Sequence, residues 1–204
     1  MPNKKIGLLD RFKEGAKDVA RDFKGDVAGL LTSVLGTAAG AAAGTGDWSP
    51  PFNQDEYEKY KPTIQQASQQ YNIPETLLTR LLYQESKFDP EIVSGKISSR
   101  AGAQGIAQFM PRTAASVSET GGVDPMDPTS SIFGAAHYLR NLNDKFPDWR
   151  DTLAAYNWGQ GNLTKKGIEN APYETSNYYQ QILFDAGIPF EYAIKDKGLL
   201  GMTP

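Results

Sequence analysis

The sequence contains no cysteine and a single histidine, His137. Without cysteine the chain can form no disulfide, and it has no thiol nucleophile and no site for a cysteine-linked lipid. A single histidine argues against a histidine-based metal site and against a Ser-His-Asp triad. We therefore expect no metal and no cofactor, and any chemistry must be carried out by carboxylates, hydroxyls and amides.

An excess of positive charge is also absent, because the 204 residues carry a formal net charge of −3. This near balance gives no electrostatic case for binding nucleic acid. Runs of alternating β-branched residues, which would indicate a major sheet, are absent as well. The length fits one compact domain plus an extension. The sequence therefore predicts an all-α protein.

Hydrophobic residues spaced three to four positions apart predict where the helices lie. Pro62 must lie in the first turns of the first of these helices or break it, because proline has no backbone N–H. Pro90 is expected to end the second helix, which begins at Pro74. The expected helices cover residues 55–71, 74–88, 111–117, 132–142, 151–158, 176–186 and, as a short last one, 191–194.

Residues 1–46 differ in composition from the rest of the chain. Residues 27–46 carry no charge and are rich in glycine and alanine, and several of the glycines are four residues apart. Such spacing lets helices approach one another closely. Before this stretch, hydrophobic residues recur in steps of three and four, as along the seam of an amphipathic helix: Leu9, Phe12, Ala16, Val19 and Phe23.

Three interpretations of residues 1–46 stay open. The segment is a helix followed by a Gly/Ala linker, a segment for assembly or membrane contact, or a secretory signal. The signal is the weakest of the three, because the region before the apolar stretch is long and contains many acidic residues.

Glu85 lies at the end of the leucine-rich helix. Leu77, Leu78, Leu81 and Leu82 form one buried stripe, and the carboxyl group follows at the edge of that core. Loss of water there raises the pKa of the carboxyl group. A raised pKa is what a general acid needs near neutral pH. The alternative is a solvated glutamate at a helix end.

Four stretches, in order, resemble the motifs of one family. Residues 85–90 read ESKFDP, 99–111 read SRAGAQGIAQFMP, 154–162 read AAYNWGQGN and 172–178 read PYETSNY. On these motifs the chain is identified as a member of the soluble lytic transglycosylases. The resemblance covers residues 57–183 and implies the lysozyme-like α fold shared with goose-type lysozymes, with a small β element at most. The chain departs from the family pattern at Ile106, Ala107, Ser131 and Trp158.

The resemblance implies a role for Glu85 in peptidoglycan cleavage. Glu85 would protonate the glycosidic oxygen between N-acetylmuramic acid and N-acetylglucosamine. The same carboxylate would then take the proton of the muramyl C6 hydroxyl, which closes on the anomeric carbon and leaves a 1,6-anhydro end. The motifs supply only this carboxylate, because Asp89 and Glu91 follow the helix end and we expect both in solvent.

The resemblance also implies which residues bind the sugars. Tyr178 is expected to form a hydrogen bond with Glu85 and orient it, with a half-buried core tyrosine as the alternative. Gly102 and Gly105 are expected to let the backbone pass close to the sugars. The full set of expected substrate-binding residues is Ser86, Ser99, Gln108, Tyr156, Asn157 and Tyr178.

These inferences divide the chain into an N-terminal segment at 1–46, a linker at 47–56, a catalytic domain at 57–192 and a C-terminal tail at 193–204. The N-terminal segment is expected to self-associate, to bind other virion proteins or to contact a membrane. We expect a phage particle component that acts in the bacterial periplasm and opens the cell wall during genome delivery, with a periplasmic bacterial enzyme as the alternative. The alternative functions are a muramidase of the same fold, which uses water, and a structural virion protein with a vestigial enzymatic domain.

Overall fold

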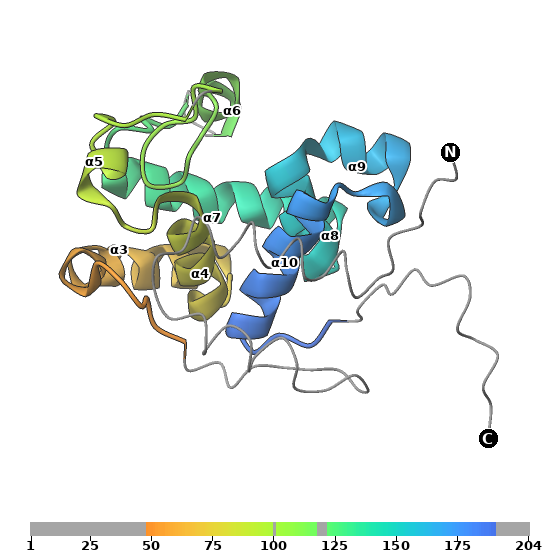
Figure 1. The fold of residues 1–204 in the computed structure, drawn as a ribbon, viewed down its shortest axis with the longest axis horizontal. Coiled ribbons are helices and arrows are strands. Elements are labelled where there is room, and N and C mark those ends of the chain that lie inside the picture. Colours follow the sequence, from red (N-terminus) through yellow and green to blue (C-terminus); the bar gives the residue numbers. More distant parts are fainter. Residues whose placement is uncertain (1–47, 100, 118–121, 191–204) are drawn as a thin grey trace, which may run out of the picture. The chain divides into compact units, whose positions relative to one another are not determined.

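Helices form nearly all of the regular structure in the computed structural model, which describes residues 48–99, 101–117 and 122–190. Strand pairing within these residues is limited to an isolated antiparallel bridge between Gln104 and Phe109. The predicted all-α fold is therefore confirmed (Figure 1). In chain order the elements are α3 (Gln54–Tyr71), α4 (Glu75–Ser86), α5 (Pro90–Val93), α6 (Pro111–Val117), α7 (Pro128–Lys145), α8 (Trp149–Ala154), the π-helix η1 (Ala155–Gly159), α9 (Gln160–Lys166), the 3₁₀-helix η2 (Ile168–Asn170) and α10 (Tyr173–Asp185).

The leucine-rich helix α4 lies at the centre of the packing. Its stripe of Leu77, Leu78, Leu81 and Leu82 is fully buried, as predicted. α3 packs along α7 and against α4, and α10 packs against α4 and α8. Burying a leucine side chain contributes about 1.5–3 kcal/mol, so this stripe anchors the helix firmly. The C-terminal end of α4, with Glu85, is where the core meets the surface.

α4 ends at Ser86, before the predicted stop at Pro90. Lys87 and Phe88 both adopt the left-handed conformation, with φ of 56° and 52°, and this interrupts the helical hydrogen bonds. The Ser86 hydroxyl stabilises the turn, because it donates to the carbonyl of Leu82 (3.0 Å) and accepts from the N–H of Phe88 (3.2 Å). Pro90 instead begins α5, where a proline needs no N–H.

Pro62 lies in the interior of α3, so the prediction that it must lie in the first turns or break the helix is wrong. Its missing N–H deprives the carbonyl of Glu58 of a helical partner. Pro62 and Glu58 are both exposed, and water can replace the lost bond on that side. The helix continues, and Ile64 and Ala67 beyond the proline are buried.

The helix predicted at 151–158 consists of two elements. α8 begins at Trp149, capped by Asp148, whose carboxylate accepts the N–H of Arg150 at 2.8 Å. From Ala155 the chain continues as the π-helix η1. A π-helix accommodates an extra residue in the helical path and is frequent at functional sites. α10 begins at Tyr173, somewhat before the predicted residue 176.

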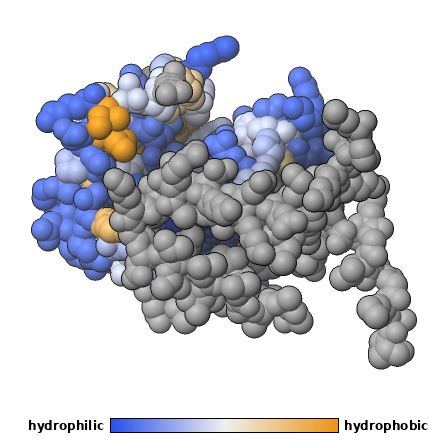
Figure 2. All heavy atoms as spheres, in the orientation of Figure 1, coloured by the Kyte–Doolittle hydropathy of each residue, from blue (hydrophilic) through white to orange (hydrophobic). Residues whose placement is uncertain are grey.

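The face drawn in Figure 2 is largely hydrophilic over the described residues, with a small hydrophobic patch at its upper left. No helix among those residues is long and apolar enough to cross a bilayer. Residues 1–46, predicted to serve assembly or membrane contact, lie outside the described part of the chain, as does the predicted helix at 191–194.

Two fully buried serines provide a matched test of this packing. The Ser131 hydroxyl in α7 has no hydrogen-bond partner among the described residues, whereas that of Ser86 makes two bonds. Ser131→Ala removes an unsatisfied polar group and should raise the free energy of unfolding by about 1 kcal/mol. Ser86→Ala leaves the N–H of Phe88 unpaired and should lower it by about 1–3 kcal/mol. Urea denaturation measures both, and equal losses would contradict this interpretation.

Candidate active site

The carboxyl group of Glu85 is held by a tyrosine from a distant part of the chain. The Tyr178 hydroxyl donates a hydrogen bond of 2.5 Å to Oε1 of Glu85. The two residues come from α4 and α10, which pack against each other. Tyr178 is buried and Glu85 is partly exposed, so the carboxyl group lies at the boundary between core and surface. The hydrogen bond that the family resemblance implies is present.

Burial raises the pKa of Glu85 to about 7. The hydrogen bond from Tyr178 and the positive charge of Lys87 lower the pKa in part, because both favour the carboxylate. A carboxyl group with such a pKa can both donate and accept a proton near neutral pH. Burial also raises the pKa of Tyr178 and Tyr156 well above the usual value, and the nearby Glu85 adds to both shifts. Both tyrosines therefore stay protonated as hydrogen-bond donors.

Two further carboxylates, Asp89 and Glu91, follow α4 close to Glu85 in the sequence. Asp89 caps α5 by accepting the N–H of Glu91 at 2.8 Å, and Glu91 is exposed. Glu91 therefore lies in solvent as predicted, whereas Asp89 is partly buried and holds a turn. Among all residues that the structure describes, no group of three or more His, Asp or Glu side chains could hold a metal ion.

Tyr156 is close enough to Glu85 for the two groups to interact electrostatically, and it contacts the turn formed by residues 104–109. Its hydroxyl donates to the carbonyl of Ala107 at 3.1 Å. The backbones of Gln104 and Phe109 exchange two hydrogen bonds of 3.0 Å, which close the turn. The Phe109 ring also lies against the Tyr156 ring, with centroids 6.3 Å apart. This turn of residues 104–109, which we call the signature turn, is thus fixed to η1, the element that carries Tyr156.

Gln108 and Gly105 lie across this turn from each other. The Gln108 side-chain amide donates to the Gly105 carbonyl at 2.9 Å, which orients the amide. A Cβ at position 105 would meet the carbonyl oxygen of Pro125 at 1.7 Å, and φ of Gly105 is +70°. This glycine is required by a neighbouring backbone segment, and the approach of sugars to it stays a prediction. Gly102 has φ of +84° and faces open space, so the prediction for it is unchanged.

Ser99 and Asn157 are exposed and help to hold two other motif segments. The Ser99 hydroxyl oxygen accepts the N–H of Ala103 at 2.8 Å. The Thr175 hydroxyl donates to Oδ1 of Asn157 at 2.8 Å and so joins α10 to η1. Four predicted residues, Glu85, Tyr178, Tyr156 and Asn157, are thus linked through α4, α10 and η1, while their contact with sugars stays a prediction.

The arrangement matches a known domain. Residues 62–179, more than half of the chain, match the family model described as the Transglycosylase SLT domain. The chain belongs to this family. The SLT domain includes Glu85, the signature turn, η1 and Tyr178.

Relatives of the chain carry related names. The transglycosylase of Enterobacteria phage PRD1 is 38% identical over 97 residues, 48% of this chain and 34% of that protein. The membrane-bound lytic murein transglycosylase F 1 of Alkalilimnicola ehrlichii is 35% identical over 118 residues, 53% of this chain and 22% of that protein. The 70 kDa soluble lytic transglycosylase of Escherichia coli matches with a TM-score of 0.52 and 26% identity, over 62% of this chain and 23% of that structure. The chain therefore spans 34% or less of each.

Ser86 of the SLT domain does not have the predicted position of a substrate-binding residue. Its side chain is fully buried, and both of its hydrogen bonds go to the backbone at the end of α4. Burial excludes direct contact with a sugar. We assign it instead to the turn after Glu85.

Two cations near Glu85 in the SLT domain were not predicted as part of the site. Burial and the charge of Arg80 lower the pKa of Lys87 to about 8, and the carboxylates of Glu85 and Asp185 act in the opposite direction. Arg80 is buried, and its Nε donates to Asp185 at 2.6 Å. The position of Lys87, two residues after Glu85, was a usable signal. A lone charged residue among the leucines of α4 was the only sign of Arg80.

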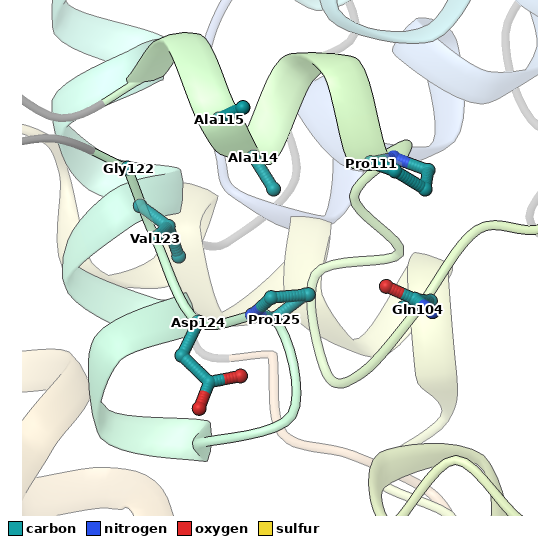
Figure 3. Close-up of a pocket in the computed structure, with 8 residues that line it drawn as sticks. All are labelled: Gln104, Pro111, Ala114, Ala115, Gly122, Val123, Asp124 and Pro125. Atoms are coloured by element: carbon teal, nitrogen blue, oxygen red, sulfur yellow. The ribbon is translucent and has the colours of Figure 1, made fainter.

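A hollow of about 430 Å³ lies beside the signature turn (Figure 3). Figure 3 shows Ala114 and Ala115 on α6, with Gln104 and Pro125 on the segments facing that helix. Glu85 is not among the residues that line it, so this hollow is separate from the carboxyl group. The lining residues are Gln104, Pro111, Ala114, Ala115, Gly122, Val123, Asp124 and Pro125.

Tyr178→Phe tests the hydrogen bond to Glu85. Without the hydroxyl, the pKa of Glu85 should rise above about 7, so the pH at which activity falls on the alkaline side should move upward. Loss of a hydrogen bond to a charged group costs about 1.5–3 kcal/mol, so kcat should fall about 10- to 100-fold. The pH profiles of kcat and of kcat/KM on purified peptidoglycan measure the two effects.

Tyr179→Phe is the matched control, because Tyr179 is the adjacent buried tyrosine of α10. Its pH profile should equal that of the unmodified protein. Unchanged turnover in Tyr178→Phe, together with a lower melting temperature, would instead support the core-tyrosine alternative.

Proposed function

We propose that the protein is a lytic transglycosylase that cleaves the β-1,4 bond between N-acetylmuramic acid and N-acetylglucosamine in peptidoglycan. The observation that carries the proposal is the carboxyl group of Glu85, whose pKa is raised to about 7 by burial and which is held by Tyr178. An acid–base group acts best when its pKa lies near the operating pH. Membership of the SLT domain family and the names of the relatives support the same reaction class.

In the first step, protonated Glu85 donates its proton to the glycosidic oxygen. The bond between that oxygen and C1 of the muramyl residue breaks, and the N-acetylglucosamine side leaves as an alcohol. Positive charge develops at C1, and negative charge develops on the Glu85 carboxylate. The hydrogen bond from Tyr178 and the charge of Lys87 stabilise this carboxylate.

In the second step, the muramyl C6 hydroxyl attacks C1 and gives its proton to the Glu85 carboxylate. This forms the 1,6-anhydro ring and returns Glu85 to its protonated state, so no water is consumed. Glycoside hydrolases generally use a second carboxylate to activate water or to attack C1. Here the substrate supplies the nucleophile, and an internal attack benefits from a high effective concentration.

In this proposal the sugars contact polar groups around Glu85. The Gln108 amide can donate and accept hydrogen bonds with hydroxyl or acetamido groups, and so can the exposed Asn157. Exposed Ser99 and the partly exposed Tyr156 complete the predicted set. Tyr156 and Asn157 have defined orientations because each forms a hydrogen bond with another part of the domain, and Gln108 is oriented by its bond to Gly105 within the same turn.

Glu85→Gln should abolish cleavage and retain binding to peptidoglycan. The substitution keeps the size of the side chain but removes the transferable proton, and a general acid–base group contributes about 10²–10⁴-fold in rate. Glu91→Gln, the same change at an exposed position, is the control and should retain full activity. Release of soluble muropeptides measures the rate. Retention of more than about a tenth of the activity by Glu85→Gln would show that another group is the acid.

Mass spectrometry of the muropeptides also separates the proposal from its alternatives. Ends of the 1,6-anhydro type are expected. Reducing ends would indicate a muramidase that uses water, and no cleavage by the unmodified protein would indicate a structural protein with a vestigial domain.

The stability of Glu85→Gln should depend less on pH than that of the unmodified protein. Because burial raises the folded-state pKa of Glu85 to about 7, the folded protein holds this proton more tightly than the unfolded chain. The resulting stabilisation is fully present below the ordinary pKa of glutamate and is lost as pH rises through about 7. Glu85→Gln stays neutral, so its melting temperature should fall less than that of the unmodified protein between pH 4 and pH 8.

We further propose that the protein belongs to a phage particle and opens the cell wall locally during genome delivery, acting in the periplasm. The similarity to a transglycosylase of phage PRD1 supports this setting, although it covers 48% of the chain. The seam of residues 9–23 and the uncharged Gly/Ala stretch support an assembly or membrane-contacting role for residues 1–46.

Deletion of residues 1–46 should therefore separate assembly from catalysis. A chain of residues 47–204 should be monomeric and fully active on purified peptidoglycan, whereas the full chain should self-associate or bind liposomes. Seam side chains such as Phe12 and Phe23 each gain roughly 1.5–3 kcal/mol when a partner buries them. Phe12→Asp with Phe23→Asp should abolish association and spare cleavage. Sedimentation and liposome flotation are the measurements. If both chains were monomeric and neither bound liposomes, residues 1–46 would serve only as a tether.

A further inference from the structure

Residues 48–53, which we call the N-terminal strap, contact the end of α4 that carries Glu85. The strap precedes α3 and is drawn in orange in Figure 1. Sequence analysis placed it in a linker, which implies no specific contact with the domain. Two of its residues, Asn53 and Trp48, contact α4 and its C-terminal turn on either side of Glu85 in the sequence.

Asn53 forms a hydrogen bond with the turn after Glu85. Its side-chain Nδ2 donates to the carbonyl of Lys87 at 2.9 Å, across 34 positions of sequence. An asparagine at the N-cap of a helix ordinarily caps that helix with its side chain. Asn53 occupies the N-cap position of α3 but makes no such bond. Its side-chain amide donates to the carbonyl of Lys87 instead.

The turn that receives this bond is conformationally costly. Lys87 and Phe88 are consecutive non-glycine residues with positive φ, a state that costs each of them of the order of 1 kcal/mol. Such a turn persists only where surrounding contacts determine it. The buried Ser86 hydroxyl supplies contacts from inside, and Asn53 supplies one from the strap.

Trp48 contacts the residues that precede Glu85. Its ring lies edge-on to that of Tyr83, with centroids 5.1 Å apart, and the Arg80 guanidinium lies 5.1 Å from the indole centroid. Arg80 in turn donates to the side chain of Gln84, the neighbour of Glu85, at 2.8 Å. The strap therefore holds the last turns of α4 through Trp48 and the turn beyond them through Asn53.

We propose that Asn53 and Trp48 are positioning residues for Glu85, so that the N-terminal strap is part of the catalytic unit. This rests on the proposed role of Glu85 as acid and base. The strap keeps the carboxyl group at its depth in the core and within reach of Tyr178. Release of the strap lets the turn relax and admits water to the carboxyl group.

Asn53→Gly is the decisive variant, because it removes the amide but keeps the positive φ of 56°. Asn72→Gly is its matched control: Asn72 caps the other end of α3 with φ of 52°. For Trp48, the variants are Trp48→Ala, the conservative Trp48→Phe, and Phe52→Ala as a control at an exposed aromatic of the same strap.

Two readouts are compared on the full chain. The first is kcat and KM on peptidoglycan across pH, and the second is NMR titration of the Glu85 side-chain carboxyl. We expect Asn53→Gly and Trp48→Ala to lower kcat about 10- to 100-fold, since small misplacement of a catalytic group has effects of this size. KM should change less than about twofold, as the sugar contacts are retained. Trp48→Phe should restore most of the rate, and both controls should match the unmodified protein.

The pKa of Glu85 should fall in the strap variants, because hydration favours the carboxylate. The alkaline limb of activity should therefore move to lower pH, opposite to the shift expected for Tyr178→Phe. An unchanged Glu85 titration in Asn53→Gly and Trp48→Ala would overturn the proposal, even if both variants melt at a lower temperature. The NMR titration does not depend on activity, so it tests the role of the strap separately from the proposed function. An active Glu85→Gln variant would refute the proposed function, and the titration would still decide the role of the strap.

Discussion

The hydrogen bond between a half-buried carboxyl group and a buried tyrosine is the interaction on which the site depends. The bond between Tyr178 and Glu85 spans 93 positions of sequence, so it forms only when α10 packs against α4. The same leucine core that fixes the two helices also excludes solvent and raises the pKa of Glu85. Stability and proton chemistry therefore have one physical origin here.

An aromatic cluster extends this rigidity to the substrate-binding turn. The rings of Phe109, Tyr138 and Tyr156 lie with centroids 5.5–6.3 Å apart, and the Tyr156 hydroxyl donates to Ala107. Packed rings have few accessible rotamers and interact favourably at these distances. The backbone expected to meet the sugars is thus fixed to η1, and the carboxyl group expected to cleave them is held by Tyr178 of α10, which packs against η1.

Local periodicity was sufficient to predict the longer helices and the buried leucines, because both leave a repeated pattern in the chain. The pairing of Glu85 with Tyr178 was predicted from the resemblance of the motifs to those of one family. Features decided by a distant partner were not predictable in this way. Gly105 is required by the carbonyl of Pro125, and Asn53 bonds to Lys87. Such contacts have no period and no motif in one sequence, so neither could be predicted from it.

In the π-helix η1, the number of residues between 155 and 159 is more strictly constrained than their identity. Successive residues of an α-helix are rotated by about 100°. Loss of a single residue would return this stretch to a regular helix and rotate the next residues of the chain by about that angle. Asn157 would then leave Thr175, its partner at 2.8 Å. Insertions and deletions should therefore be far less tolerated in this short stretch than replacements of its exposed side chains.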